Sequence, residues 1–120
     1  MRTIKFRAFN KEDQKMYQCL TGLFFDDDLI TAHFLSSYGD TEIVAVNDLE
    51  VMQFTGLLDK NGREIYEGDI IKRENETSIV EYDNDIASFI PFGKDDFSWD
   101  NSRCEVIGNV FENPELMEAT

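Results

Sequence analysis

The spacing of apolar and turn-forming residues is the feature that most constrains how this chain folds. Runs rich in β-branched and aromatic residues recur about every ten residues, and no run keeps a helical period over the length of an ordinary helix. The first run alternates, with Ile4, Phe6 and Ala8 on one side and Lys5 and Arg7 on the other. This period of two is typical of a strand with one buried face. The sequence therefore predicts a mainly β protein of the small-barrel or sandwich class.

The remaining strands are expected between polar or glycine-containing turns. Asn47–Asp48 is expected either to cap one helical turn or to close a hairpin. Near the C-terminus, Asn113 is expected to cap a single helical turn, with Pro114 at its first position. The expected strands are MYQCLTGLFF, Leu29–Leu35, Ile43–Val46, Ile70–Glu74, Thr77–Tyr82, Ile86–Phe92 and Arg103–Gly108.

The stretch Phe54–Lys72, FTGLLDKNGREIYEGDIIK, is the strongest candidate for a ligand loop. It lacks the spacing of a phosphate-binding loop, because Arg and Glu follow Gly62 where Lys and Ser or Thr are needed. It also lacks the spacing of a calcium loop, because Gly62 comes too early after Asp59. Asn61–Gly62 is instead typical of a two-residue hairpin turn, and Gly68 is typical of a second turn. We therefore interpret the stretch as two turns of a small sheet.

The charge of the chain argues against direct binding to nucleic acid. The net charge is −14, from 25 acidic and 11 basic residues, and such a field repels phosphate backbones. The only local concentration of basic residues is Arg2, Lys5 and Arg7. Two interpretations stay open: the acidity serves solubility, or the protein is an acidic decoy for the basic groove of a DNA-binding protein.

Neither catalysis nor cofactor binding is indicated. Cys19 and Cys104 lack the spacing of a zinc site, and His33 is the only histidine and lies in an apolar run. No serine or cysteine has an evident catalytic partner. We therefore expect no enzyme activity, no catalytic residue, no metal and no cofactor. With no signal peptide and no apolar run long enough to span a membrane, the chain is expected in the cytoplasm, with free thiols.

Three segments carry a family resemblance. They are IKFRAF near the start, MQFTGLLDKNGREIYEGDII in the middle and EVIGNVFENPEL near the end. In this order they resemble the signature blocks of the YopX family, a group of small, largely uncharacterised proteins encoded by bacteriophages and prophages. The chain departs from the family pattern at Phe9–Asn10, where Trp-Asp is usual, and at Phe111, where Tyr is frequent. The positions that match the motif include Gly56, Asn61, Gly62, Gly68 and Gly108.

The resemblance implies a fold and leaves the activity open. It implies an SH3-like small barrel in the C-terminal half, with an N-terminal β-rich extension and short helical turns. We accordingly expect an N-terminal β-rich region at residues 1–50 and the barrel region at residues 51–120, packed as one compact unit. The family has no established catalytic residues to carry over.

The expected function is that of a phage- or prophage-encoded acidic protein-binding factor whose target is a host or phage protein, such as a nucleic-acid-binding protein. The alternative is a structural or assembly protein acting as a homo-oligomer. SH3-like barrels commonly bind peptides through aromatic side chains beside acidic loops. On that basis the candidate partner contacts are Tyr66, Phe97, Trp99, Asp95, Asp96 and Asp100. The competing interpretation is that Phe97 and Trp99 fold back as a plug on the end of the barrel.

Overall fold

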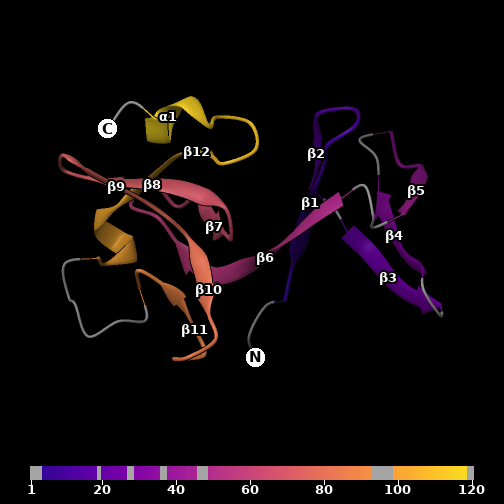
Figure 1. Ribbon diagram of the computed structural model, residues 1–120, viewed down its shortest axis with the longest axis horizontal. Coiled ribbons are helices and arrows are strands. Elements are labelled where there is room, and N and C mark those ends of the chain that lie inside the picture. The colour runs from indigo at the N-terminus through magenta and orange to yellow at the C-terminus, as the bar shows by residue number, and fades with distance from the viewer. Residues whose placement is uncertain are drawn as a thin grey trace. The chain divides into compact units, whose positions relative to one another are not determined.

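The structure is a computed structural model that describes residues 4–18, 20–26, 29–35, 38–45, 49–92 and 99–118 (Figure 1). Strands dominate these ranges, which confirms the prediction of a mainly β protein. The chain divides into two compact units, an N-terminal unit of Ile4–Gln53 and a C-terminal unit that begins at Phe54. In the described ranges no helix has the length and apolar character needed to cross a membrane.

The N-terminal unit contains two antiparallel sheets. One places β1 between β2 and the first half of β6, and the other has the order β3-β4-β5. Ala8, Ala32, Phe34 and Leu49 form the buried core. The strands are β1 (Phe6–Asn10), β2 (Lys15–Tyr17), β3 (Leu20–Asp26), β4 (Leu29–Leu35), β5 (Thr41–Ala45) and β6 (Leu49–Leu58). Residues 46–48, which include the predicted Asn47–Asp48 cap or turn, lie outside the described residues.

The prediction that β1 has one buried face was wrong. Arg7, Ala8, Phe9 and Asn10 are all buried, and Arg7 is only 5% exposed. Four consecutive buried residues mean that both faces of this central strand are covered. The alternation was misleading because the long apolar stem of an arginine can be buried with its neighbours. Ile4, expected on the buried side, precedes the strand and is 66% exposed.

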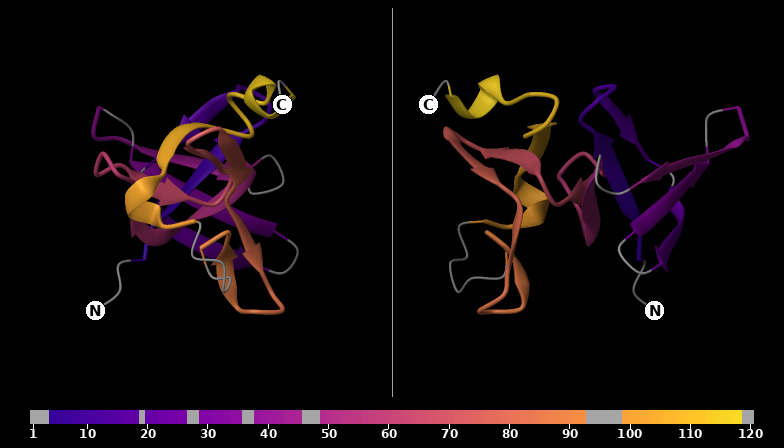
Figure 2. Two further views of the ribbon diagram at one scale, coloured as in Figure 1. Left: turned by 90° about the vertical axis from the view of Figure 1, so that its left-hand side faces the viewer. Right: turned by 45° about the vertical axis from the view of Figure 1, so that its right-hand side comes forward.

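The C-terminal unit combines short antiparallel strands (Figure 2), and these pack around an apolar core. Its central sheet has the order β12-β8-β9, β10 pairs with β11, and the second half of β6 pairs with β7. Its core consists of Ile65, Ile71, Val80, Cys104 and Val106. The elements are β7 (Glu64–Tyr66), β8 (Asp69–Arg73), β9 (Glu76–Ile79), β10 (Glu81–Asp83), β11 (Ser88–Ile90), the 3-10 turn η2 (Asn101–Arg103), β12 (Glu105–Asn109) and α1 (Glu115–Glu118).

The hairpin predicted around Asn61–Gly62 is present, as β6 and β7. Its turn is longer than the two-residue turn typical of that dipeptide. The amide of Asp59 donates to the carbonyl of Arg63 over 2.8 Å, so the loop runs between these two residues. Within it only Gly62 has a positive φ, of 81°. The longer turn is stabilised by the Asp59 side chain, which accepts hydrogen bonds from the backbone amides of Asn61 and Arg63.

The second predicted turn is also present. Gly68 has a φ of 83°. Its amide donates to the carbonyl of Val80 over 2.8 Å, and its carbonyl accepts from the amide of Val110 over 2.9 Å. The Asp69 side chain closes the turn by accepting from the amide of Tyr66 over 2.8 Å. This one glycine therefore connects segments far apart in the sequence.

Replacing Gly68 by valine is expected to destabilise the fold. A β-branched side chain is a poor fit to positive φ, so Gly68→Val should cost about 1–3 kcal/mol of unfolding free energy. Chemical denaturation of the two proteins measures the difference. Gly68→Asn is the control, because asparagine tolerates this conformation better and should cost less. An unchanged midpoint for the valine variant would contradict the turn assignment.

The predicted C-terminal helical turn is α1. Asn113 precedes it, but its side-chain oxygen accepts from the amide of Asn109 in β12 over 3.2 Å. A Cβ on Gly108 would lie 2.6 Å from that same oxygen. Gly108, one of the positions that match the family motif, thus permits close packing between β12 and the segment before α1.

Candidate functional site

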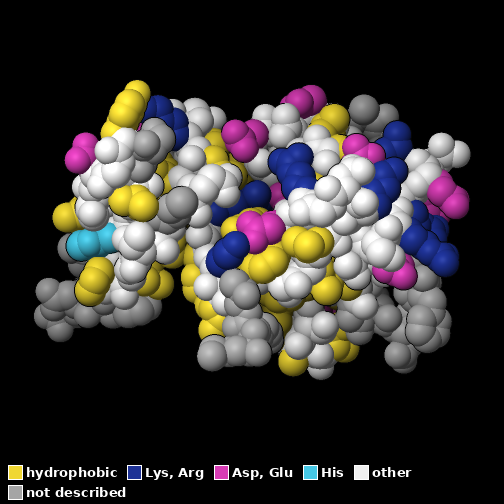
Figure 3. Space-filling view, turned by 180° about the vertical axis from the view of Figure 1, so that it is seen from behind, with side chains coloured by type: hydrophobic (Ala, Val, Ile, Leu, Met, Phe, Trp, Pro, Cys, Tyr) yellow, Lys and Arg dark blue, Asp and Glu magenta, His cyan; other side chains and the backbone are white. Residues whose placement is uncertain are grey.

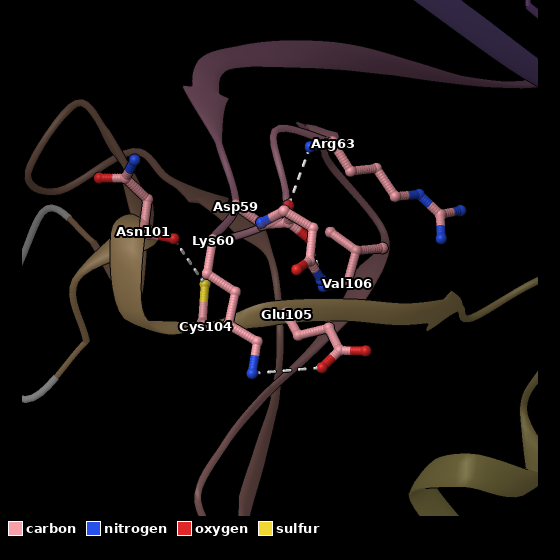
Figure 4. A network of polar contacts seen from close by, with 8 residues as sticks. Asp59, Lys60, Arg63, Asn101, Cys104, Glu105 and Val106 are labelled. Carbon is pink, nitrogen blue, oxygen red and sulfur yellow. Dashed lines mark hydrogen bonds and ion pairs between the residues drawn. The ribbon is translucent and has the colours of Figure 1, made fainter.

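The carboxylate of Asp59 is the hub of a polar network in the C-terminal unit (Figure 4). Asp59 is 5% exposed. One of its oxygens accepts from the amides of Asn61 and Arg63, each over 2.9 Å, and the other accepts from the amide of Val106 over 2.9 Å. The carboxylate therefore holds the β6–β7 turn closed and ties it to β12.

The electrostatics of Asp59 suit a structural role. Burial by itself would raise its pKa, but the amides of Val106, Arg63 and Asn61 outweigh burial and hold the pKa below its ordinary value. Hydrogen bonds to the charged form favour that form. Asp59 is therefore a buried anion whose two oxygens are already engaged by the backbone.

Cys104, beside this network, is a packed thiol. It is fully buried, and its Sγ donates to the carbonyl of Asn101 over 3.4 Å. Burial, followed by the nearby Asp59 charge, raises the pKa of Cys104 to about 11. Because the thiolate is the nucleophilic form, this thiol is poorly suited to attack a substrate. Cys19 lies outside the described residues.

The candidate contacts taken from the sequence lie in different settings. Tyr66 is 5% exposed, its ring lies 5.4 Å from that of Phe54, and its hydroxyl donates to Glu64 over 3.4 Å. Its ring is therefore largely inside the fold. Asp100 is exposed and accepts from the amide and hydroxyl of Ser102, over 2.9 Å and 2.8 Å, at the start of η2. Asp95, Asp96 and Phe97 lie outside the described residues.

Trp99 is half-buried and packs against the core cluster of the C-terminal unit. The guanidinium carbon of Arg73 lies 5.5 Å from the centre of its ring, within the range of a cation–π contact. This placement favours the plug interpretation. Asp100 thus caps η2, Trp99 packs on the core of the C-terminal unit, and Tyr66 lies buried on β7.

An acid-lined hollow lies at the β10–β11 hairpin, where the sequence analysis expected only two strands and the turn between them. Its volume is about 320 Å³. Tyr82 stays 46% exposed and meets Phe89 edge-on, with the ring centres 5.2 Å apart. The available signal was an aromatic residue set among acids in EYDND. The residues lining the hollow are Glu81, Tyr82, Asp83, Asn84, Asp85 and Ile90.

Metal or nucleotide binding is not expected to stabilise the protein. Across the described part of the chain, no three His, Cys, Asp or Glu side chains are grouped to hold a metal ion. Zinc, calcium, EDTA and ATP should leave the thermal midpoint unchanged, apart from weak screening of the −14 charge. Thermal denaturation with each compound tests this expectation. A saturable rise with any one of them would contradict it.

Comparison with known proteins establishes the family. A profile of the family described as YopX protein matches residues 5–118. The chain belongs to the YopX family. This match covers nearly the whole chain, so both units belong to the family's domain.

A solved structure is similar to this YopX-family chain over its whole length. It is the crystal structure of protein EF1440 from Enterococcus faecalis, with a TM-score of 0.66 and 28% sequence identity. The similarity covers 98% of this chain and 99% of that one. No curated protein matches the sequence.

Proposed function

We propose that this YopX-family protein is a non-enzymatic binding factor for a basic protein, and that the β10–β11 hairpin carries the contact surface. The observation that carries the proposal is the acid-lined hollow beside the exposed ring of Tyr82. Aromatic side chains supply large contact area at low entropic cost, and acidic groups around them select a positively charged partner.

The charge of the lining favours a protein partner over nucleic acid. Glu81, Asp83 and Asp85 contribute three acidic side chains to the hollow, and the whole chain carries a net charge of −14. A phosphate backbone would be repelled, whereas a lysine- or arginine-rich segment would be attracted over about a Debye length. A phage- or prophage-encoded protein of this kind, acting in the cytoplasm of a bacterial host, is suited to occupying the basic surface of a host or phage nucleic-acid-binding protein.

We infer further that the C-terminal unit is an SH3-like small barrel. Its short antiparallel strands, its tight turns and its single apolar core support this assignment. The buried carboxylate of Asp59 and the buried thiol of Cys104 both make hydrogen bonds with the backbone of this unit and have packing roles. These roles support a binding function over a catalytic one.

Capture from host lysate tests the proposed function. The full-length protein on a support should retain a partner rich in lysine and arginine, and the partner should elute as salt is raised. The double variant Asp83→Asn with Asp85→Asn should reduce capture by about ten-fold, because it removes two charges while keeping the side-chain shapes. The Asp83 carboxylate accepts from the backbone amide of Asp85 over 2.9 Å, and the carboxamide oxygen that replaces it in the variant can accept the same bond.

The matched control is Glu74→Gln with Glu115→Gln, which removes the same number of charges from exposed positions outside the hollow. Capture should be unaffected by this pair beyond the general loss of net charge. Equal losses for both pairs would contradict the hairpin as the contact surface. Retention of no basic protein by the parent would contradict the proposed function itself.

A further inference from the structure

The N-terminal unit, which does not contain the β10–β11 hairpin, exposes an apolar sheet face. We use the name outer sheet face for Phe24, His33, Leu35 and Ile43. The register of β3-β4-β5 pairs His33 with Ile43, and Leu35 follows His33 by two residues, so their side chains share one side of the sheet. Ala32 and Phe34, on the opposite side, are buried in the core.

This face is apolar and open to solvent. Phe24 is 55%, Leu35 47% and Ile43 64% exposed. The Phe24 ring lies 4.6 Å from the His33 ring and occupies the space where a Cβ on Gly22 would stand, at 2.7 Å. Figure 3 shows yellow hydrophobic side chains gathered around the cyan histidine. Exposed apolar side chains that gather on one face of a sheet are candidates for an interaction site.

The edge of the same sheet can accept another strand. In the described part of the chain β5 pairs only with β4, so its other edge presents backbone amides and carbonyls. Strand edges are usually blocked by charged residues, above all lysine, by proline or by a bulge. The sequence of β5, TEIVA, has one charged residue, Glu42, but neither lysine nor proline, and its pairing with β4 runs without a register shift. The other edge strand, β3, does have a shift, between Leu20 and Gly22.

The charge around this sheet selects the occupant. Residues 20–45, which contain all three strands, include five acidic residues and no lysine or arginine. Of these, Glu42 lies in β5 and Asp40 directly precedes it, and both are exposed. A second copy of the chain would bring an identical acidic edge against Glu42, with no lysine or arginine from the same segment. A basic strand would complement this edge instead, with its apolar side chains on the outer sheet face. The five residues are Asp26, Asp27, Asp28, Asp40 and Glu42.

We propose that the β5 edge and the outer sheet face bind an extended, basic polypeptide segment by strand addition. The segment alternates lysine or arginine with apolar residues, and its backbone hydrogen-bonds along β5. This inference rests on the proposed function, since it supplies a second surface for a basic protein, but the surface lies on the other unit and can be tested independently.

A synthetic peptide of alternating lysine and valine, matched in length to β5, is the probe. Titration into the full-length protein, followed by calorimetry, should show saturable binding that weakens about ten-fold or more as salt is raised from about 0.05 M to about 0.5 M. Peptides alternating glutamate with valine, or lysine with serine, should not bind. The lysine–valine peptide N-methylated along one edge should also lose binding, because it cannot add as a strand.

Leu35→Thr and Leu58→Thr form a matched pair of variants, since both leucines are 47% exposed and lie in strands of different units. Leu35→Thr combined with Ile43→Thr should weaken peptide binding about ten-fold or more, while Leu58→Thr leaves it unchanged. Circular dichroism confirms that each variant is folded.

Three outcomes overturn the inference, and each leaves the proposed function to its own test. One is absence of peptide binding by the folded parent. Another is that the hairpin variant Asp83→Asn with Asp85→Asn loses peptide binding while Leu35→Thr with Ile43→Thr keeps it. That result would assign the peptide to the hollow. The last is that light scattering detects self-association which strengthens with salt and which Ile43→Thr abolishes. That result would assign the outer sheet face to a second copy of the chain.

Discussion

Asp59→Ala is expected to lower the free energy of unfolding by about 2–4 kcal/mol, because it leaves buried backbone amides without an acceptor. The side chain accepts from Asn61, Arg63 and Val106, and the Val106 amide lies in the interior on β12. Asp59→Asn should also destabilise the fold, since a single amide oxygen cannot serve both the turn and β12. Urea denaturation followed by circular dichroism measures both losses.

Asp100→Ala is the matched control, because the Asp100 side chain also accepts a hydrogen bond from a backbone amide but is exposed. Its effect should be far smaller. A similar loss for both aspartates, or no loss for Asp59→Ala, would contradict the hub assignment.

The hub also predicts how stability depends on pH. The pKa of Asp59 is lower in the folded protein than its ordinary value of 3.8, so the folded state binds this proton less tightly than the unfolded state. Its stabilisation is therefore fully present above the ordinary pKa and is lost as pH falls through the lower folded value. Denaturation midpoints of the parent should fall more steeply than those of Asp59→Asn across this acidic window. Parallel profiles would contradict the prediction.

Trp99→Ala is expected to cost about 2–4 kcal/mol, somewhat less than deletion of a fully buried aromatic residue, since Trp99 is half-buried against the core cluster. The ring also loses its contact with Arg73, at 5.5 Å. Because Trp99 is the only tryptophan, circular dichroism is the appropriate signal for the variant.

Trp99→Phe should recover part of this loss, and Tyr82→Ala, which removes an exposed ring from the same unit, should cost less. In the competing interpretation Trp99 contacts the partner. The Trp99→Ala variant would then keep nearly the same free energy of unfolding and would lose capture of a partner. Running denaturation and capture on one preparation separates the two interpretations.

Much of the secondary structure could be predicted because its causes are local. Leu29–Leu35 was predicted as a strand from its apolar, β-branched composition and is β4 with those same bounds. The turn at Gly68 was predicted because glycine adopts positive φ without steric cost, and its φ is 83°. Strand propensity and turn chemistry act over a few residues, so they are visible in one sequence.

The candidate site was less predictable because exposure is set by distant residues. Tyr66 was expected as a contact and lies buried beside Phe54, whereas Tyr82, read only as part of a strand, is exposed beside the hollow. An aromatic residue on a short strand is compatible with either position. Which ring faces the core depends on the strands packed against it.

The sequence by itself determined the family, the β class and the position of the main turns, since these depend on motifs and short-range backbone preferences. Only the tertiary structure decided that Arg7 is buried and that Asp59 reaches Val106, 47 residues further along the chain. It also decided that Phe24, Leu35 and Ile43 stay exposed together. The physical reason is that burial and hydrogen-bond partners at such separations follow from how the strands pair and pack, which a local pattern of residues does not encode.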